Sequence, residues 1–145
     1  MQSTKAVSGS KHPTEAGSLA IDTSAAISLF RGHRKTLEYF NGASEIWMPV
    51  TVLGELYCGL RKCDNPEKER LRIGDLRKRC LVVDVDEGTS IRYAQVYSDM
   101  ERKGEMVPIN DIWIAAFAMR HAMPLLADDG HFRGVDGLDL IDLRQ

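Results

Sequence analysis

Short apolar runs alternate with longer helical segments along most of this chain, and this alternation restricts the fold more than any other feature. The runs have strand length, and they are LAI (19–21), IWMPV (46–50), LVVDV (81–85), PLLA (124–127) and LDLIDL (138–143). The segments between them are typical of helices, over residues 24–41, 50–62, 66–80, 87–103 and 111–121, with a break expected at Gly32. This alternation predicts βαβ units. The predicted fold class is therefore α/β, a three-layer α/β/α sandwich with a mostly parallel central sheet.

The length of the chain suits a single domain, because 145 residues can bury roughly two-thirds of their unfolded surface in one core. Residues 1–18 are small and polar without the apolar stretch of a secretory signal, so we expect a flexible N-terminal tail before a folded domain over residues 19–145. No apolar run reaches the length of a transmembrane helix. We therefore expect a cytoplasmic protein with no membrane partner.

Cysteine content and charge exclude several classes of protein. Cys58, Cys63 and Cys80 are odd in number and form no CxxC pair, which argues against a disulfide framework or a structural zinc site. A net charge of -2 and a pI near 6.1 argue against a generally basic surface for nucleic acid. The stretch 61–79 is rich in both basic and acidic residues, which favours a solvated helical face with ion pairs over a surface that follows phosphates.

Acidic residues recur where the predicted strands end. Asp22 follows LAI and precedes a capping sequence, Thr23-Ser24, while Glu55 lies about one helical turn after IWMPV. Two further acids, Asp128 and Asp129, follow PLLA, and Asp111 opens the last predicted helix. Each alone is compatible with a helix cap, an exposed helical position or a turn. Together they are expected to converge, because ligands of open α/β sheets bind outside the carboxyl ends of the strands.

The segment PINDIWIAAFAMRH places Asp111 directly before an apolar run, residues 112–119. At helical spacing, Ile114, Ala115 and Ala118 share the face of Asp111, so its carboxylate extends a face that is buried. A desolvated carboxylate is costly. A helix N-terminus, a hydrogen-bond network or a cation must therefore stabilise it.

Four motifs, LAIDTSA, TVLGELYCGL, PINDIWIAAFAM and LLADDGHF, resemble the PIN domain family in their order and spacing, and more narrowly its VapC-type toxins of type II toxin–antitoxin pairs. The resemblance spans about residues 19–143. It implies a PIN-like ribonuclease domain with an acidic quartet at Asp22, Glu55, Asp111 and Asp129. Family members often have Thr or Ser at the position of Ala127, so a helper hydroxyl is missing and a substitute role for Asp128 stays open.

The resemblance also implies an endoribonuclease that depends on Mg²⁺ or Mn²⁺ and is silenced by a cognate antitoxin. Hard divalent cations prefer carboxylate oxygens, so we expect Asp22 and Asp111 to bind the cation directly. Glu55 and Asp129 bind it directly, through water or through a second ion. The expected partners are an RNA substrate such as a tRNA, the antitoxin and a second copy of the chain. The homodimer is expected because residues 112–119 are apolar around most of the helix and the segments near Tyr57 and Tyr93 add apolar surface.

Two alternatives stay open. The first is a catalytically inactive PIN-like binding module, in which Ala127 marks a decaying site, although all four acids of the quartet are present. The second is a phospho-receiver domain or an aspartate-dependent phosphatase, which Ser24 and the lack of a Lys after PLLA disfavour. The histidines His121 and His131 show no metal-binding spacing, so surface or capping roles are expected for them.

Overall fold

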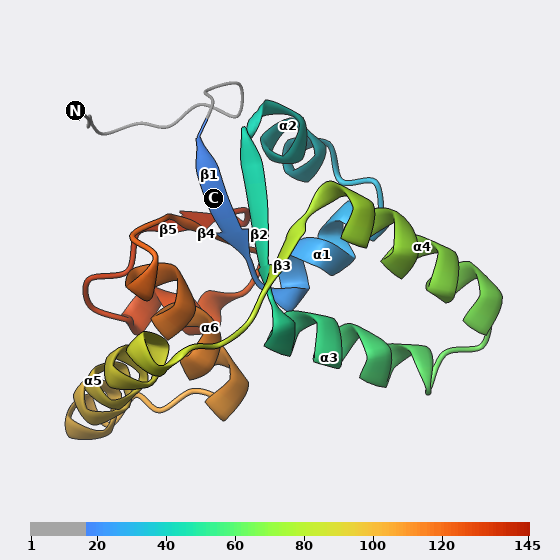
Figure 1. The fold of residues 1–145 in the computed structure, drawn as a ribbon. Helices are drawn as coiled ribbons and strands as arrows, with labels where there is room; N and C mark the ends of the chain where they lie inside the picture. The colour runs from blue at the N-terminus through green and yellow to red at the C-terminus, as the bar shows by residue number, and fades with distance from the viewer. Residues whose placement is uncertain (1–16) are drawn as a thin grey trace.

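The computed structural model describes residues 17–145, and at its centre lies a five-stranded sheet in the order β3-β2-β1-β4-β5 (Figure 1). Every pair of neighbouring strands is parallel, which confirms the predicted parallel sheet. The strands are β1 (Ser18–Ile21), β2 (Glu45–Pro49), β3 (Leu81–Val83), β4 (Leu125–Ala127) and β5 (Leu140–Asp142). Of the expected tail, residues 1–16 lie outside the described residues, and β1 begins at Ser18.

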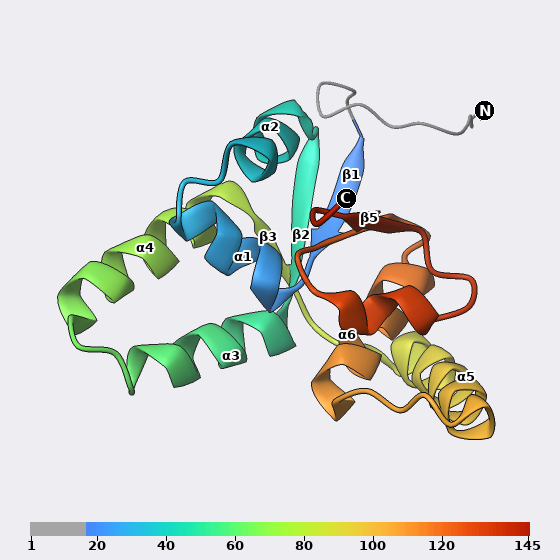
Figure 2. The same ribbon diagram turned by 180° about the vertical axis from the view of Figure 1, so that it is seen from behind.

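Helices cover both faces of the sheet, so the predicted three-layer α/β/α sandwich is confirmed. In Figures 1 and 2 the first four helices lie on one side of the sheet and the next two on the other. The helices are α1 (Thr23–Phe30), α2 (Arg34–Gly42), α3 (Val50–Leu60), α4 (Pro66–Arg79), α5 (Glu87–Lys103) and α6 (Ile109–Arg120), with a 3-10 turn η1 (Gly130–Gly134) after β4.

The strand order explains both the layers and the position of the crevice. From β1 the chain adds β2 and β3 in one direction, then returns to add β4 and β5 in the other. Right-handed crossovers between parallel strands place the helices of the two directions on opposite faces. Neighbouring helices therefore diverge between β1 and β4, and the carboxyl ends of these two strands border a crevice where ligands of such sheets bind.

Two helix boundaries matter for the site. The predicted break at Gly32 is confirmed, since its φ of 73° is left-handed and separates α1 from α2. By contrast, α6 begins at Ile109 with Pro108 at the N-cap, two residues earlier than predicted. The expectation that Asp111 opens this helix is thus wrong, because the rigid φ of Pro108 suits the start of the helix. Asp111 lies inside the first turn and leaves its carboxylate free for tertiary contacts.

The apolar side chains of α6 are buried within the single chain. Ile112 and residues 114–118 are fully buried, while Trp113 stacks on Tyr93 of α5 with ring centroids 4.0 Å apart. The predicted burial of the face of Asp111 is therefore confirmed. However, the apolar circumference of α6 gives no support to a dimer, because the sheet and α5 already cover it.

Three smaller expectations also have structural outcomes. All three cysteines are free. The charged stretch forms α4, where Glu67 pairs with Arg70 and Glu69 with Arg72 while Ile73 and Leu76 face the core, which supports the interpretation as a solvated helical face. No helix within residues 17–145 combines the length and the apolar character needed to cross a membrane.

Candidate functional site

The predicted acids gather at the carboxyl ends of the strands. Glu55 from α3, Asp111 from α6 and Asp129 after β4 line one hollow of about 420 Å³. The other residues that line this acidic hollow are Pro108, Ile109, Asn110 and His131. Asp22 is not part of its surface, since it is only 2% exposed, but it follows β1, the strand that pairs with β4. Three of the four predicted acids therefore share the hollow, and the fourth is buried.

Asp22 is held from several directions at the start of α1. Its carboxylate accepts hydrogen bonds from the backbone N–H of Ala25 at 2.9 Å and from the Ser24 hydroxyl at 2.7 and 2.8 Å. Asp22, rather than Thr23 or Ser24, is thus the N-cap of this helix. The pKa of Asp22 is raised to about 6, mainly by burial and in smaller part by the negative charge of Asp111, while these hydrogen bonds act to lower it.

Asp111 is the second acid of the site with a raised pKa. Its side chain is 14% exposed. Burial raises its pKa, the hydrogen bond with His131 opposes that increase, and the negative charges of Asp129 and Glu55 add to it. The acids from β1, α3, α6 and the segment after β4 therefore repel one another, which links them electrostatically as one cluster.

Hydroxyl groups from the start of α1 reach two parts of the site. Thr23 donates a hydrogen bond to Glu55 Oε1 at 2.5 Å, across 32 residues of sequence. Ser24, besides donating to Asp22, accepts the backbone N–H of Asp128 at 2.8 Å. Ala127 is fully buried and has no hydroxyl to offer. The Ser24 hydroxyl thus connects the end of β1 to the segment after β4.

The segment after β4 orients its own acid through a local turn. Asp129 is the N-cap of η1, and its Oδ1 accepts the backbone N–H of His131 at 2.9 Å. Phe132, the next residue, is only 1% exposed and anchors the turn in the core. Asp128 contributes its backbone N–H to this arrangement, and a role for its carboxylate stays a prediction.

His131 is the site residue that the sequence did not reveal. Its side chain is half exposed, as expected for a surface residue, but its ring Nδ1 lies 2.8 Å from Asp111 Oδ2 and 3.4 Å from Asp129 Oδ1. The expected surface position of His131 is confirmed, and its contacts with Asp111 and Asp129 are an addition that the sequence did not predict. The local signal was the Asp129-Gly130-His131 turn, which directs a side chain two residues after the acid back toward it. The contact of the ring with Asp111, 20 residues away in the sequence, has no such local signal, because it depends on tertiary packing.

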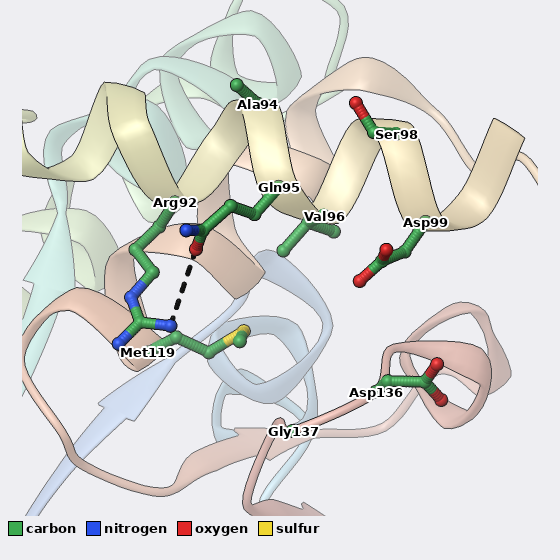
Figure 3. A pocket seen from close by; sticks show the side chains of 9 residues that line it. All are labelled: Arg92, Ala94, Gln95, Val96, Ser98, Asp99, Met119, Asp136 and Gly137. Carbon is green, nitrogen blue, oxygen red and sulfur yellow. Dashed lines mark hydrogen bonds between the residues drawn. The ribbon is translucent and has the colours of Figure 1, made fainter. Parts of the chain in front are cut away.

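A second hollow of about 660 Å³ offers a contrast (Figure 3). It lies between α5 and the segment before β5, and its lining includes Arg92, Met119, Asp99 and Asp136. Both of these acids already have basic partners, since Asp99 pairs with Arg102 at 2.7 Å and Asp136 with Lys103 at 3.2 Å. The acids of this hollow are therefore neutralised by their own surroundings.

The acidic hollow lacks such compensation. Among residues 17–145, no Lys or Arg forms an ion pair with Asp22, Glu55, Asp111 or Asp129. One donor atom each from Asp111, Asp129 and His131 lies within 4.8 Å of the others. Clustered carboxylates that have no Lys or Arg partner, two of which, Asp22 and Asp111, have raised pKa values, form the oxygen-rich donor set that hard divalent cations prefer. The residues present therefore fit a bound divalent cation.

Comparisons with known proteins show which family the chain resembles. The family model for the PIN domain matches residues 19–138. Ribonuclease VapC4 of Mycobacterium tuberculosis is 32% identical over 96 residues, which are 65% of this chain and 74% of that protein. Ribonuclease VapC2 of Haemophilus influenzae is 26% identical over 113 residues, 75% of this chain and 84% of that protein.

The solved structures show the same fold. The DNA-bound VapBC of Salmonella typhimurium superposes with a TM-score of 0.79 at 23% identity, covering 86% of this chain and 97% of that one. For VapBC2 of Rickettsia felis, bound to a DNA fragment of its promoter, the TM-score is 0.77 at 19% identity, with 86% and 98% covered. At these identities the likeness concerns the fold alone.

Proposed function

This chain belongs to the PIN domain family, and we propose from this that it is a metal-dependent endoribonuclease, the toxin of a toxin–antitoxin pair. The observation that carries the proposal is the acid cluster at the carboxyl ends of β1 and β4, which forms no ion pair with a Lys or Arg among the described residues. The relatives named ribonuclease support RNA as the substrate class. The inactive binding module is less well supported, because the four acids are present and hydroxyls orient two of them.

In this proposal Asp22 and Asp111 hold Mg²⁺ or Mn²⁺ directly, and Glu55 and Asp129 hold it directly or through water. When bound, the cation stabilises the charge that develops on the scissile phosphate and lowers the pKa of an attacking water. The chain orients the donors, since Ser24 and Ala25 fix Asp22 and Thr23 fixes Glu55. Without the cation, these carboxylates repel a phosphodiester, so the affinity for RNA depends on metal loading.

The partners proposed for this chain are its RNA substrate, of which a tRNA is one reasonable class, and a cognate antitoxin. Support for the antitoxin comes from solved structures of similar fold, among them VapBC of Salmonella typhimurium and VapBC-5 of Mycobacterium tuberculosis, a member of the VapBC family of toxin–antitoxin systems. A basic side chain of an antitoxin that entered the acidic hollow would compensate Glu55, Asp111 and Asp129 and displace the cation. Inhibition would then be electrostatic as well as steric.

RNA cleavage by the purified protein tests the proposal. We expect discrete cuts in total RNA with Mg²⁺ or Mn²⁺, no cuts with EDTA, and none from Asp22→Asn. Asp64→Asn is the matched control, because Asp64 is an exposed acid between α3 and α4, outside the hollow, and it should cleave like wild type. Identical cuts from Asp22→Asn would reveal a contaminating nuclease, and a folded wild type inert with both metals would favour the binding module.

A further inference from the structure

His131 is fixed in direction by both neighbouring residues and by the turn that contains it. Its backbone N–H is bonded to Asp129, and the buried ring of Phe132 anchors the next position. The guanidinium of Arg144 lies against Gly130 of η1. The imidazole therefore reaches the acids from a turn that the Asp129 hydrogen bond and the buried Phe132 hold in place, and half of its side-chain surface remains open toward solvent.

The distances around Nδ1 match those between donors that share one cation. Two donors at right angles, each about 2.1 Å from a cation, lie about 3 Å apart. Nδ1 lies 2.8 Å from Asp111 Oδ2 and 3.4 Å from Asp129 Oδ1, which brackets that value. Without metal, a hydrogen bond between Nδ1 and the carboxylate accounts for the shorter of these distances. A cation that took the place of this hydrogen bond would be surrounded by the same three residues, Asp111, Asp129 and His131.

An imidazole nitrogen changes which cation such a site prefers. Carboxylate and water oxygens suit Mg²⁺ and Mn²⁺, whereas imidazole suits the first-row transition metals, whose affinity for nitrogen donors rises from Mn²⁺ onward. Mg²⁺ gains little from a nitrogen ligand. A site with two carboxylates and one imidazole thus has a higher affinity for Mn²⁺ than for Mg²⁺, although both cations are divalent and both accept oxygen ligands.

We propose that His131 is a metal ligand of the acidic hollow, and that its Nδ1, together with Asp111 and Asp129, makes this site select first-row transition metals such as Mn²⁺ over Mg²⁺. The inference rests on the proposed function, since it concerns the same site. It assigns a nitrogen ligand to a centre whose other expected ligands are all carboxylates.

Metal binding to the full chain, measured by calorimetry at fixed pH after removal of EDTA, tests this assignment. Wild type should bind Mn²⁺ at least about tenfold more tightly than Mg²⁺. The variant His131→Gln should lose about tenfold or more in Mn²⁺ affinity and about threefold or less in Mg²⁺ affinity. His33→Gln, a substitution of an exposed histidine before α2, should match wild type. Electron spin echo spectroscopy of bound Mn²⁺ should show a directly coupled ¹⁴N nucleus in wild type and none in His131→Gln.

The outcomes separate this inference from the proposed function. If Asp111→Asn abolishes metal binding and RNA cleavage while His131→Gln keeps the wild-type ratio of Mn²⁺ to Mg²⁺ affinity, His131 is not a ligand and the nuclease proposal stands. An equal loss for both metals without a ¹⁴N signal in wild type would also overturn the ligand assignment, leaving His131 as a hydrogen-bond partner of Asp111. A wild type that binds neither metal would overturn both proposals.

Discussion

Asp22 gives the site its clearest dependence on pH. Its folded pKa of about 6 exceeds the ordinary value of 3.8 because the carboxyl group is buried. The folded state therefore binds this proton more tightly than the unfolded state does. Below pH 4 both states are protonated, and as pH rises through 6 the metal-free protein loses about 3 kcal/mol of stability.

The variant Asp22→Asn removes this titration and almost preserves the shape of the side chain. In EDTA above pH 6 we expect it to be more stable than wild type, by up to about 3 kcal/mol, with the difference disappearing below pH 4. Urea unfolding at a series of pH values measures both curves. Parallel curves for the two proteins would mean that Asp22 has an ordinary pKa in the folded state.

Asp111 leads to a related prediction about metal. Asp111→Asn removes one charge from a cluster in which Asp129 and Glu55 repel it, at the cost of its charged contact with His131. Without metal the variant should melt close to or above wild type. At a hundredfold excess over its dissociation constant, Mn²⁺ should stabilise wild type by about 2.7 kcal/mol and the variant by much less. Thermal melts with and without metal decide this, and strong destabilisation of Asp111→Asn in EDTA would identify a purely structural acid.

At the scale of elements, Ser24 connects α1 to the segment between β4 and η1. Its hydroxyl accepts the backbone N–H of Asp128 and donates to Asp22. Ser24→Ala leaves that part-buried N–H without its partner, so we expect a loss of about 1–2 kcal/mol. Ser90→Ala is the control, because the Ser90 hydroxyl is exposed and bonds only within its own helix. Chemical denaturation compares the two, and equal small losses would show that the connection contributes little.

At the scale of the whole molecule, the homodimer stays a prediction, and the surface that supports it keeps the segment near Tyr57 from the original expectation but not α6. β3 is an edge strand, and Leu81 and Val82 on it are 46% and 38% exposed, while Val50 and Tyr57 of the neighbouring α3 are each 39% exposed. Apolar residues on an edge strand favour association with another chain. This surface replaces α6 as the reason to expect a dimer.

Sedimentation at micromolar concentration tests this expectation. Wild type should sediment as a dimer, and Leu81→Asp should shift it toward monomer because a charge at the interface would have to be desolvated. Leu71→Asp is the matched control, since Leu71 is 69% exposed and belongs to α4 rather than to the edge strand. A wild type that remains monomeric, or an equal effect of both substitutions, would contradict this surface.

The sequence by itself determined the order of strands and helices, the parallel sheet and the acids near the strand ends. These features depend on local patterns: apolar runs of strand length, a glycine with left-handed φ at position 32, and acids placed directly after a strand or in the first turns of a helix. Because the carboxyl ends of parallel strands lie at the same edge of a sheet, the ends of β1 and β4 come together there, and a cluster of acids followed from the sequence alone.

Only the tertiary structure decided how those acids are surrounded. The burial of Asp22, the bond from Ser24 to the segment after β4 and the approach of His131 to Asp111 all join residues from different elements. The burial of α6 inside one chain was equally hidden, because an apolar helix looks the same whether the sheet or a second molecule covers it. Periodicity specifies which face of an element is apolar, whereas packing in three dimensions selects the atoms that meet it.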